Sequence, residues 1–220
     1  MEGKKIFPNF WQALLFNCII PMVVLAIVIV TIVFLKIVDI NKLYTFNSYF
    51  GHILTIPILL FFLWKSKIKV RWAEFTKLNI KNILIVIALT IIIDFVFRGT
   101  ISLFDYLFNL NYPASSSNTY YLAIIHSLVL APIIEELLYR RVFLHQFLKH
   151  YPVWVAVTLS AVLFTMPHVP VILHFELFVP FFISGIFLGL VYYKTNSISY
   201  CIIGHFIMNL LTYAPFDKIF

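Results

Sequence analysis

The stretch LVLAPIIEELLYR, residues 128–140, places two adjacent glutamates, Glu135 and Glu136, inside an otherwise apolar segment. An ionisable side chain within a membrane-spanning segment is costly, and such residues usually serve a function. The glutamate pair therefore predicts a functional site inside a segment that spans a membrane.

The composition of the whole chain agrees with a membrane location. Of its 220 residues, 62% are hydrophobic and 11% are charged, whereas a soluble domain is about half apolar and a quarter charged. The formal net charge of +7 comes from basic residues in short loops between apolar runs. That pattern is typical of the positive-inside rule and of attraction to anionic membrane lipid, and it argues against nucleic-acid binding.

Hydropathy predicts an all-α, polytopic transmembrane helical bundle with about seven spans. Crossing the hydrocarbon core takes about 20 apolar residues in a helix. The segments that approach this length are about 13–36, 47–64, 82–97, 120–149, 153–166, 176–193 and 197–213. The basic loop 65–81 predicts a multi-pass protein of the plasma membrane whose N-terminus is cytoplasmic.

Helical spacing sorts the polar residues of span four. Glu136 and Arg140 are four residues apart, so they share a helix face and are predicted to form an ion pair. Glu135 is rotated from Glu136 by about 100° and escapes full neutralisation by Arg140. On span seven, His205 and Asn209 are also four apart and present two polar groups to one place.

Hairpin depth connects span four to span five. If the two spans turn near Tyr151, Glu135 lies 16 residues before the turn and His168 lies 17 residues after it. At a rise of about 1.5 Å per residue, both side chains reach nearly the same depth. We therefore expect a site between spans four, five and seven.

The residue types at this site suit peptide hydrolysis, which needs a base, a group that positions water and donors for the oxyanion. Glu135 is the candidate base and His168 the candidate for holding the water. His205 and Asn209 are candidate oxyanion donors. Two histidines and a carboxylate are also a common Zn²⁺ set, but the HExxH signature is absent, so the spacing requires no metal or other cofactor.

Three motifs in these spans resemble one known family. EELLYR at 135–140, FTMPH at 164–168 and HFIMN at 205–209 match the EExxxR, FxxxH and HxxxN motifs. These motifs are typical of the CAAX-protease and bacteriocin-processing (CPBP, or Abi) family of intramembrane glutamate peptidases, and the resemblance covers about residues 120–213.

The resemblance implies roles for individual residues. Glu135 and His168 would activate water, His205 and Asn209 would form the oxyanion hole, and Glu136 with Arg140 would support the site. It also implies a division of the single membrane domain into N-terminal spans with the basic cytoplasmic loop (1–118) and a catalytic core (119–220).

The substrate implied by the resemblance is a peptide or protein, either prenylated or a bacteriocin or signal peptide. The short chain, rich in Ile, Lys, Phe and Asn, is similar to the bacterial members, which are linked to bacteriocin maturation, self-immunity or peptide signalling. Two alternatives stay open. One is a non-catalytic bacteriocin-immunity or partner-binding protein on the same fold. The other is a transporter or channel, which the absence of an internal repeat disfavours.

Overall fold

The computed structural model describes residues 78–108, 124–166, 168 and 177–212, together with Ile56, Leu59, Leu60, Leu63 and Phe75. All regular structure within these residues is helical, which confirms the all-α prediction. The predicted span at 13–36, most of that at 47–64 and the loop at 111–118 lie outside the described residues. The count of seven spans therefore stays a prediction.

Helix α4, Ile80–Phe108, is 29 residues long and continues well beyond the predicted span at 82–97. An ion pair explains the extension, because Arg98 Nε lies 2.8 Å from Asp94 Oδ2 one turn earlier. Only Val86 and Thr90 of this helix are buried. A long apolar helix that exposes most of its side chains suits a lipid environment, and by length and composition α4 can cross a membrane.

The segment that carries the two glutamates is a continuous helix with two π-helical parts. Its elements are η1 (His126–Leu130), α6 (Ala131–Glu136), η2 (Leu137–Leu144) and α7 (His145–Phe147). Pro132 accounts for the first irregularity, because proline donates no hydrogen bond and its ring crowds the carbonyl four residues earlier. The helical course predicted for 120–149 is therefore confirmed over residues 124–147, and the π-helical parts are a detail that the sequence did not predict.

A tight turn follows, as predicted near Tyr151, and helix α8 occupies Val153–Thr165. Helix α9, Phe178–Thr195, returns antiparallel to it and is the second described helix long and apolar enough to cross a membrane. The two helices nearly touch at Gly185, where an added Cβ would lie 3.0 Å from the Cα of Ala161.

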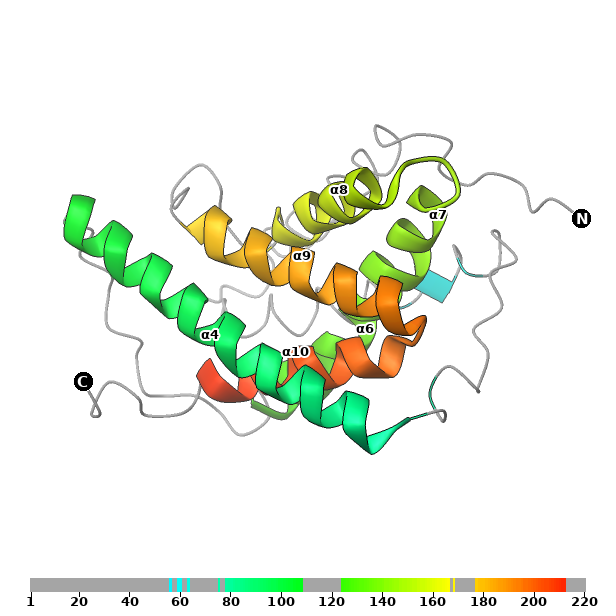
Figure 1. Ribbon diagram of the computed structural model, residues 1–220, viewed down its shortest axis with the longest axis horizontal. Helices are drawn as coiled ribbons and strands as arrows, with labels where there is room; N and C mark the ends of the chain where they lie inside the picture. Colours follow the sequence, from blue (N-terminus) through cyan, green and yellow to red (C-terminus); the bar gives the residue numbers. More distant parts are fainter. Residues whose placement is uncertain are drawn as a thin grey trace, which may run out of the picture.

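Helix α10, Ile198–Thr212, follows α9 after Asn196, whose φ of 48° turns the chain. It packs against both α4 and α9, which also contact each other, and Figure 1 shows it alongside α4. The approach is close at Gly204, where a Cβ would lie 3.2 Å from Leu188 of α9 and 3.3 Å from the hydroxyl of Thr90 of α4.

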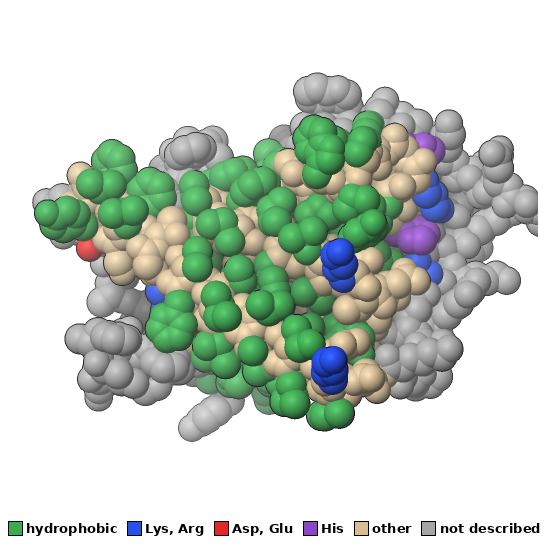
Figure 2. Space-filling model, viewed as in Figure 1, with side chains coloured by type: hydrophobic (Ala, Val, Ile, Leu, Met, Phe, Trp, Pro, Cys, Tyr) green, Lys and Arg blue, Asp and Glu red, His purple; other side chains and the backbone are tan. Residues whose placement is uncertain are grey.

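Several exposed basic side chains gather at one end of this bundle. The start of α4 lies beside the start of α10, because the Asn79 amide donates to the Tyr200 hydroxyl at 2.7 Å. Lys81 therefore lies near the end of α9 that carries Lys194, and Lys149 precedes α8 at that same end. Figure 2 shows a mainly hydrophobic face with Lys, Arg and His gathered toward one side. This distribution is typical of loops on one side of a membrane.

Candidate active site

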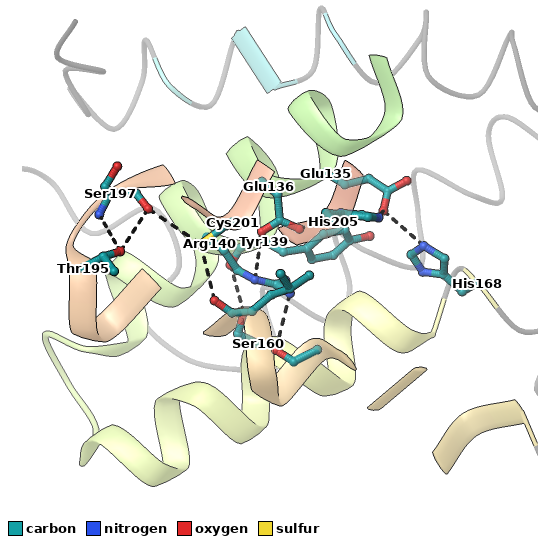
Figure 3. A network of polar contacts seen from close by, with 12 residues as sticks. Glu135, Glu136, Tyr139, Arg140, Ser160, His168, Thr195, Ser197, Cys201 and His205 are labelled. Carbon is teal, nitrogen blue, oxygen red and sulfur yellow. Dashed lines mark hydrogen bonds and ion pairs between the residues drawn. The ribbon is translucent and has the colours of Figure 1, made fainter. Parts of the chain in front are cut away.

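Glu135 on α6 and His168, three residues past the end of α8, point toward each other, as Figure 3 shows. Oε2 of Glu135 lies 3.1 Å from Nε2 of His168, and both side chains are mostly buried, with 14% and 22% of their surface exposed. The equal depth predicted from the hairpin is therefore observed. Part of each side chain is exposed, whereas Oε2 of Glu135 itself is buried.

The hydrogen bonds of His168 fix how its ring is protonated. Nδ1 lies 2.6 Å from the carbonyl oxygen of Phe164. A carbonyl oxygen only accepts, so Nδ1 carries a proton and donates it. Nε2 is then left to face the Glu135 carboxyl group. A hydrogen bond between these two atoms needs one proton, held either by the carboxyl group or by the ring.

His205 joins the site from α10. Its Nε2 lies 3.9 Å from Oε2 of Glu135, and its Nδ1 lies 2.9 Å from Oε1 of Glu136. The second contact was not predicted from the sequence. It connects the two adjacent glutamates through a single imidazole ring, so that one edge of the ring is held by Glu136 while the other faces Glu135.

The predicted ion pair between Glu136 and Arg140 is present. Arg140 Nε lies 3.1 Å from Glu136 Oε2, and both side chains are fully buried. These two atoms are close enough for an ion pair, but neither makes an aligned hydrogen bond with a described residue. Arg140 also donates to the Gly185 carbonyl at 3.4 Å and places its guanidinium 4.7 Å from the centre of the Phe164 ring. One buried cation thus ties the helix of the glutamates to α8 and α9.

Asn209 lies one turn after His205 on α10. Its Nδ2 donates to the backbone carbonyl of Ser127 at 2.8 Å, which joins α10 to η1. This side-chain amide carries two hydrogens, so the bond to Ser127 occupies only one of them. The sequence motif identified Asn209 but gave no sign of this anchor.

Phe164 lies at the centre of the site. The centre of its ring is 4.5 Å from that of His168, 5.6 Å from that of His205 and 5.4 Å from that of Tyr139. Such ring pairs contribute about 0.5–1.5 kcal/mol each beyond the area they bury. Sequence reasoning found Phe164 only as a letter of a motif, whereas the structure gives it contacts with both histidines.

Metal ligation was the alternative use of these side chains. Within the part of the chain that the structure describes, no group of three or more His, Cys, Asp or Glu side chains has the arrangement of a metal site. Independence from metal stays a prediction, which a chelator can test.

Part of this chain is similar to a known protein family. Residues 117–211 match the family described as Type II CAAX prenyl endopeptidase Rce1-like. That range holds Glu135, His168, His205 and Asn209, and it leaves out α4. No curated protein and no solved structure matches the chain. The carboxy-terminal part of this protein is therefore similar to the Rce1-like family of CAAX proteases, in agreement with the resemblance of the three sequence motifs.

Proposed function

We propose that this protein is an intramembrane endopeptidase that hydrolyses a peptide bond with water activated by Glu135. The observation that supports the proposal is a convergence of three side chains from three helical segments. Oε2 of Glu135 lies within 3.1 Å of one histidine nitrogen and 3.9 Å of another. A carboxylate that faces two imidazoles in a mostly buried site is suited to moving a proton.

In the proposed reaction, a water molecule binds beside the Glu135–His168 pair, within hydrogen-bond reach of the Glu135 carboxylate. Glu135 takes a proton from this water while the water oxygen attacks the peptide carbonyl carbon. The oxyanion that forms accepts hydrogen bonds from the second N–H of Asn209 and from Nε2–H of His205 in its protonated state. Glu135 then returns the proton to the amine nitrogen as the C–N bond breaks, which leaves a carboxyl group and an amine.

Glu136 and Arg140 act in this scheme without touching the substrate. The Glu136 carboxylate accepts from Nδ1–H of His205 at 2.9 Å, so it orients the ring with Nε2 toward Glu135. Arg140 holds that carboxylate in place from the next turn of the helix. The scheme uses no metal and no other cofactor.

The family suggests which substrate to test first. The matched family is described as a CAAX prenyl endopeptidase, so we propose a prenylated peptide with a CAAX terminus as the first probe. A bacteriocin or signal peptide is the second substrate class. We place the protein in the plasma membrane with a cytoplasmic N-terminus, because Lys4, Lys5 and the basic loop 65–81 follow the positive-inside pattern.

The test compares Glu135→Gln with the wild-type protein in detergent, using a fluorogenic prenylated CAAX peptide and a chelator. Loss of a general base typically lowers the rate by about 10²–10⁴-fold. The matched control is Asp94→Asn, which removes a membrane-embedded carboxylate of α4 and should retain activity. Full activity of Glu135→Gln would contradict the proposal. Protection of a producer strain by Glu135→Gln would favour the non-catalytic immunity role.

A further inference from the structure

His168 has little backbone structure of its own to hold it. It follows the end of α8 at Thr165, and its amide donates to the Thr165 carbonyl at 3.0 Å. Its ring is tied to Phe164 both through the Nδ1 hydrogen bond and through ring contact at 4.5 Å. Both of these contacts are local, so they move with α8 and do not fix the imidazole relative to the other helices.

A contact from α9 gives the ring a second reference point, in addition to the approach of Glu135 from α6. The ring of Phe181 stacks on the imidazole of His168 with centroids 5.1 Å apart and planes 29° apart. Phe181 lies outside the three motifs, and it comes 13 residues after His168 in the chain. We propose that Phe181 is a positioning residue, which holds the His168 ring at the angle that lets Nε2 face Glu135. This inference rests on the role proposed for His168.

Phe181 is itself supported from outside the segment that matches the family. The ring of Phe97 on α4 meets it edge to face, with centroids 5.3 Å apart. The next residue, Arg98, donates to the carbonyl of Leu211 at 2.7 Å near the end of α10. Neighbouring residues of α4 thus hold α9 beside His168 and α10 beyond His205. Phe97 is therefore expected to act on His168 through Phe181.

The chain offers a matched control on the same helix. Phe182 follows Phe181, and its ring stacks on that of Phe178 with centroids 5.7 Å apart. The change Phe182→Leu removes a stacked ring from α9 with the same loss of volume as Phe181→Leu. A difference between the two variants therefore reports the contact with His168 and not a general weakening of α9.

The first measurement needs no substrate. We would label histidine with ¹⁵N, record the ring resonances by NMR in detergent micelles, and assign those of His168 by their loss in His168→Gln. Phe181→Leu is expected to move and broaden the His168 signals, Phe181→Tyr to preserve them, and Phe182→Leu to leave them unchanged. Phe97→Leu should produce a smaller shift. Equal spectra for Phe181→Leu and Phe182→Leu would overturn the proposal.

The second measurement separates kcat from KM on the prenylated CAAX peptide. An aromatic contact near the upper end of its usual range corresponds to about a tenfold loss of rate. Phe181→Leu should lower kcat by about that factor with little change in KM, and Phe181→Tyr should restore it. Equal losses in kcat for the two leucine variants would also overturn the proposal. A wild-type protein that cleaves no probe would count against the proposed function, while the NMR comparison would still decide the role of Phe181. If Phe181→Leu fails to fold, Phe97→Leu decides in the same two assays.

Discussion

The buried pair of Glu136 and Arg140 allows a quantitative test of what holds the site together. Both side chains are fully buried and their closest charged atoms are 3.1 Å apart. Removing one partner of such a pair costs about 3–5 kcal/mol, because the other charge stays buried without compensation. Arg140→Met and Glu136→Met remove one charge each with apolar side chains of useful volume, and the double variant removes both.

The structure predicts which single variant is worse. After Arg140→Met, the Glu136 carboxylate keeps His205, whose Nδ1 is 2.9 Å away and can share a charge on the ring. We expect a loss near the lower end, about 3 kcal/mol. After Glu136→Met, the guanidinium cannot lose its proton, and its contacts among the described residues are then the Gly185 carbonyl and the face of Phe164. We expect a loss nearer 5 kcal/mol.

The double variant leaves no stranded charge, so its cost should fall below the sum of the two singles by about 2–3 kcal/mol. The free energy of unfolding would be measured by equilibrium titration in mixed micelles of a mild detergent and SDS. Asp94→Asn is the matched control, because its partner Arg98 is less buried than Arg140 and keeps a hydrogen bond to the Leu211 carbonyl, so its cost should be smaller than that of Glu136→Met. Additive single costs, or a Glu136→Met cost no larger than that of the control, would refute this reasoning.

Three further predictions concern packing, the amide anchor and topology. Gly185→Ala should destabilise the protein by about 1–3 kcal/mol, because its Cβ would lie 3.0 Å from the Ala161 backbone. The control is Gly99→Ala, whose Cβ would meet nothing within 4 Å and which should be neutral or stabilising in the same unfolding assay. Asn209→Asp should lower the free energy of unfolding by about 1–3 kcal/mol and abolish cleavage, since it sets an oxygen against the Ser127 carbonyl. Ser127→Ala retains that carbonyl and should keep activity. A larger loss of activity in Ser127→Ala than in Asn209→Asp would exclude the anchor. Lys81→Cys and Lys194→Cys should both react with a membrane-impermeant thiol reagent from the same side in oriented vesicles, and Tyr106→Cys from the other side; labelling of the two lysine positions from opposite sides would contradict the arrangement of the helices.

Much of the site followed from spacing along the chain. The meeting of Glu135 and His168 needed only the position of a turn and the rise of a helix, and both are local properties. The pairing of Glu136 with Arg140 needed only the periodicity of one helix. The bounds of α8 and α10 were close to the predicted spans because their flanking residues interrupt the apolar runs.

Features that depend on packing between distant segments were missed. The hydrogen bond from His205 to Glu136 depends on how α10 meets α6, which hydropathy does not specify. The π-helical segments η1 and η2 leave no signal in an apolar pattern, although Pro132 marks where regular bonding fails. The full length of α4 could have been predicted from the four-residue spacing of Asp94 and Arg98. Two opposite charges at this spacing can pair, so Arg98 did not have to mark the end of the span. Nothing in the sequence distinguishes Phe181, which stacks on His168, from the many other phenylalanines of the chain.

The placement of Glu136 and Arg140 one turn apart also bears on how this helix enters the bilayer during synthesis. An acidic or basic side chain at the centre of a helix adds about 2.5–3.5 kcal/mol to the free energy of insertion. Because the two opposite charges lie in one segment, they can neutralise each other before any other helix has arrived. Glu135 then meets His168 on the next helix to be made, and His205 reaches both carboxylates only with α10. Each charged group of the site can thus pair with a partner soon after its own helix is synthesised, so that at no stage of synthesis is the whole cluster unpaired in lipid.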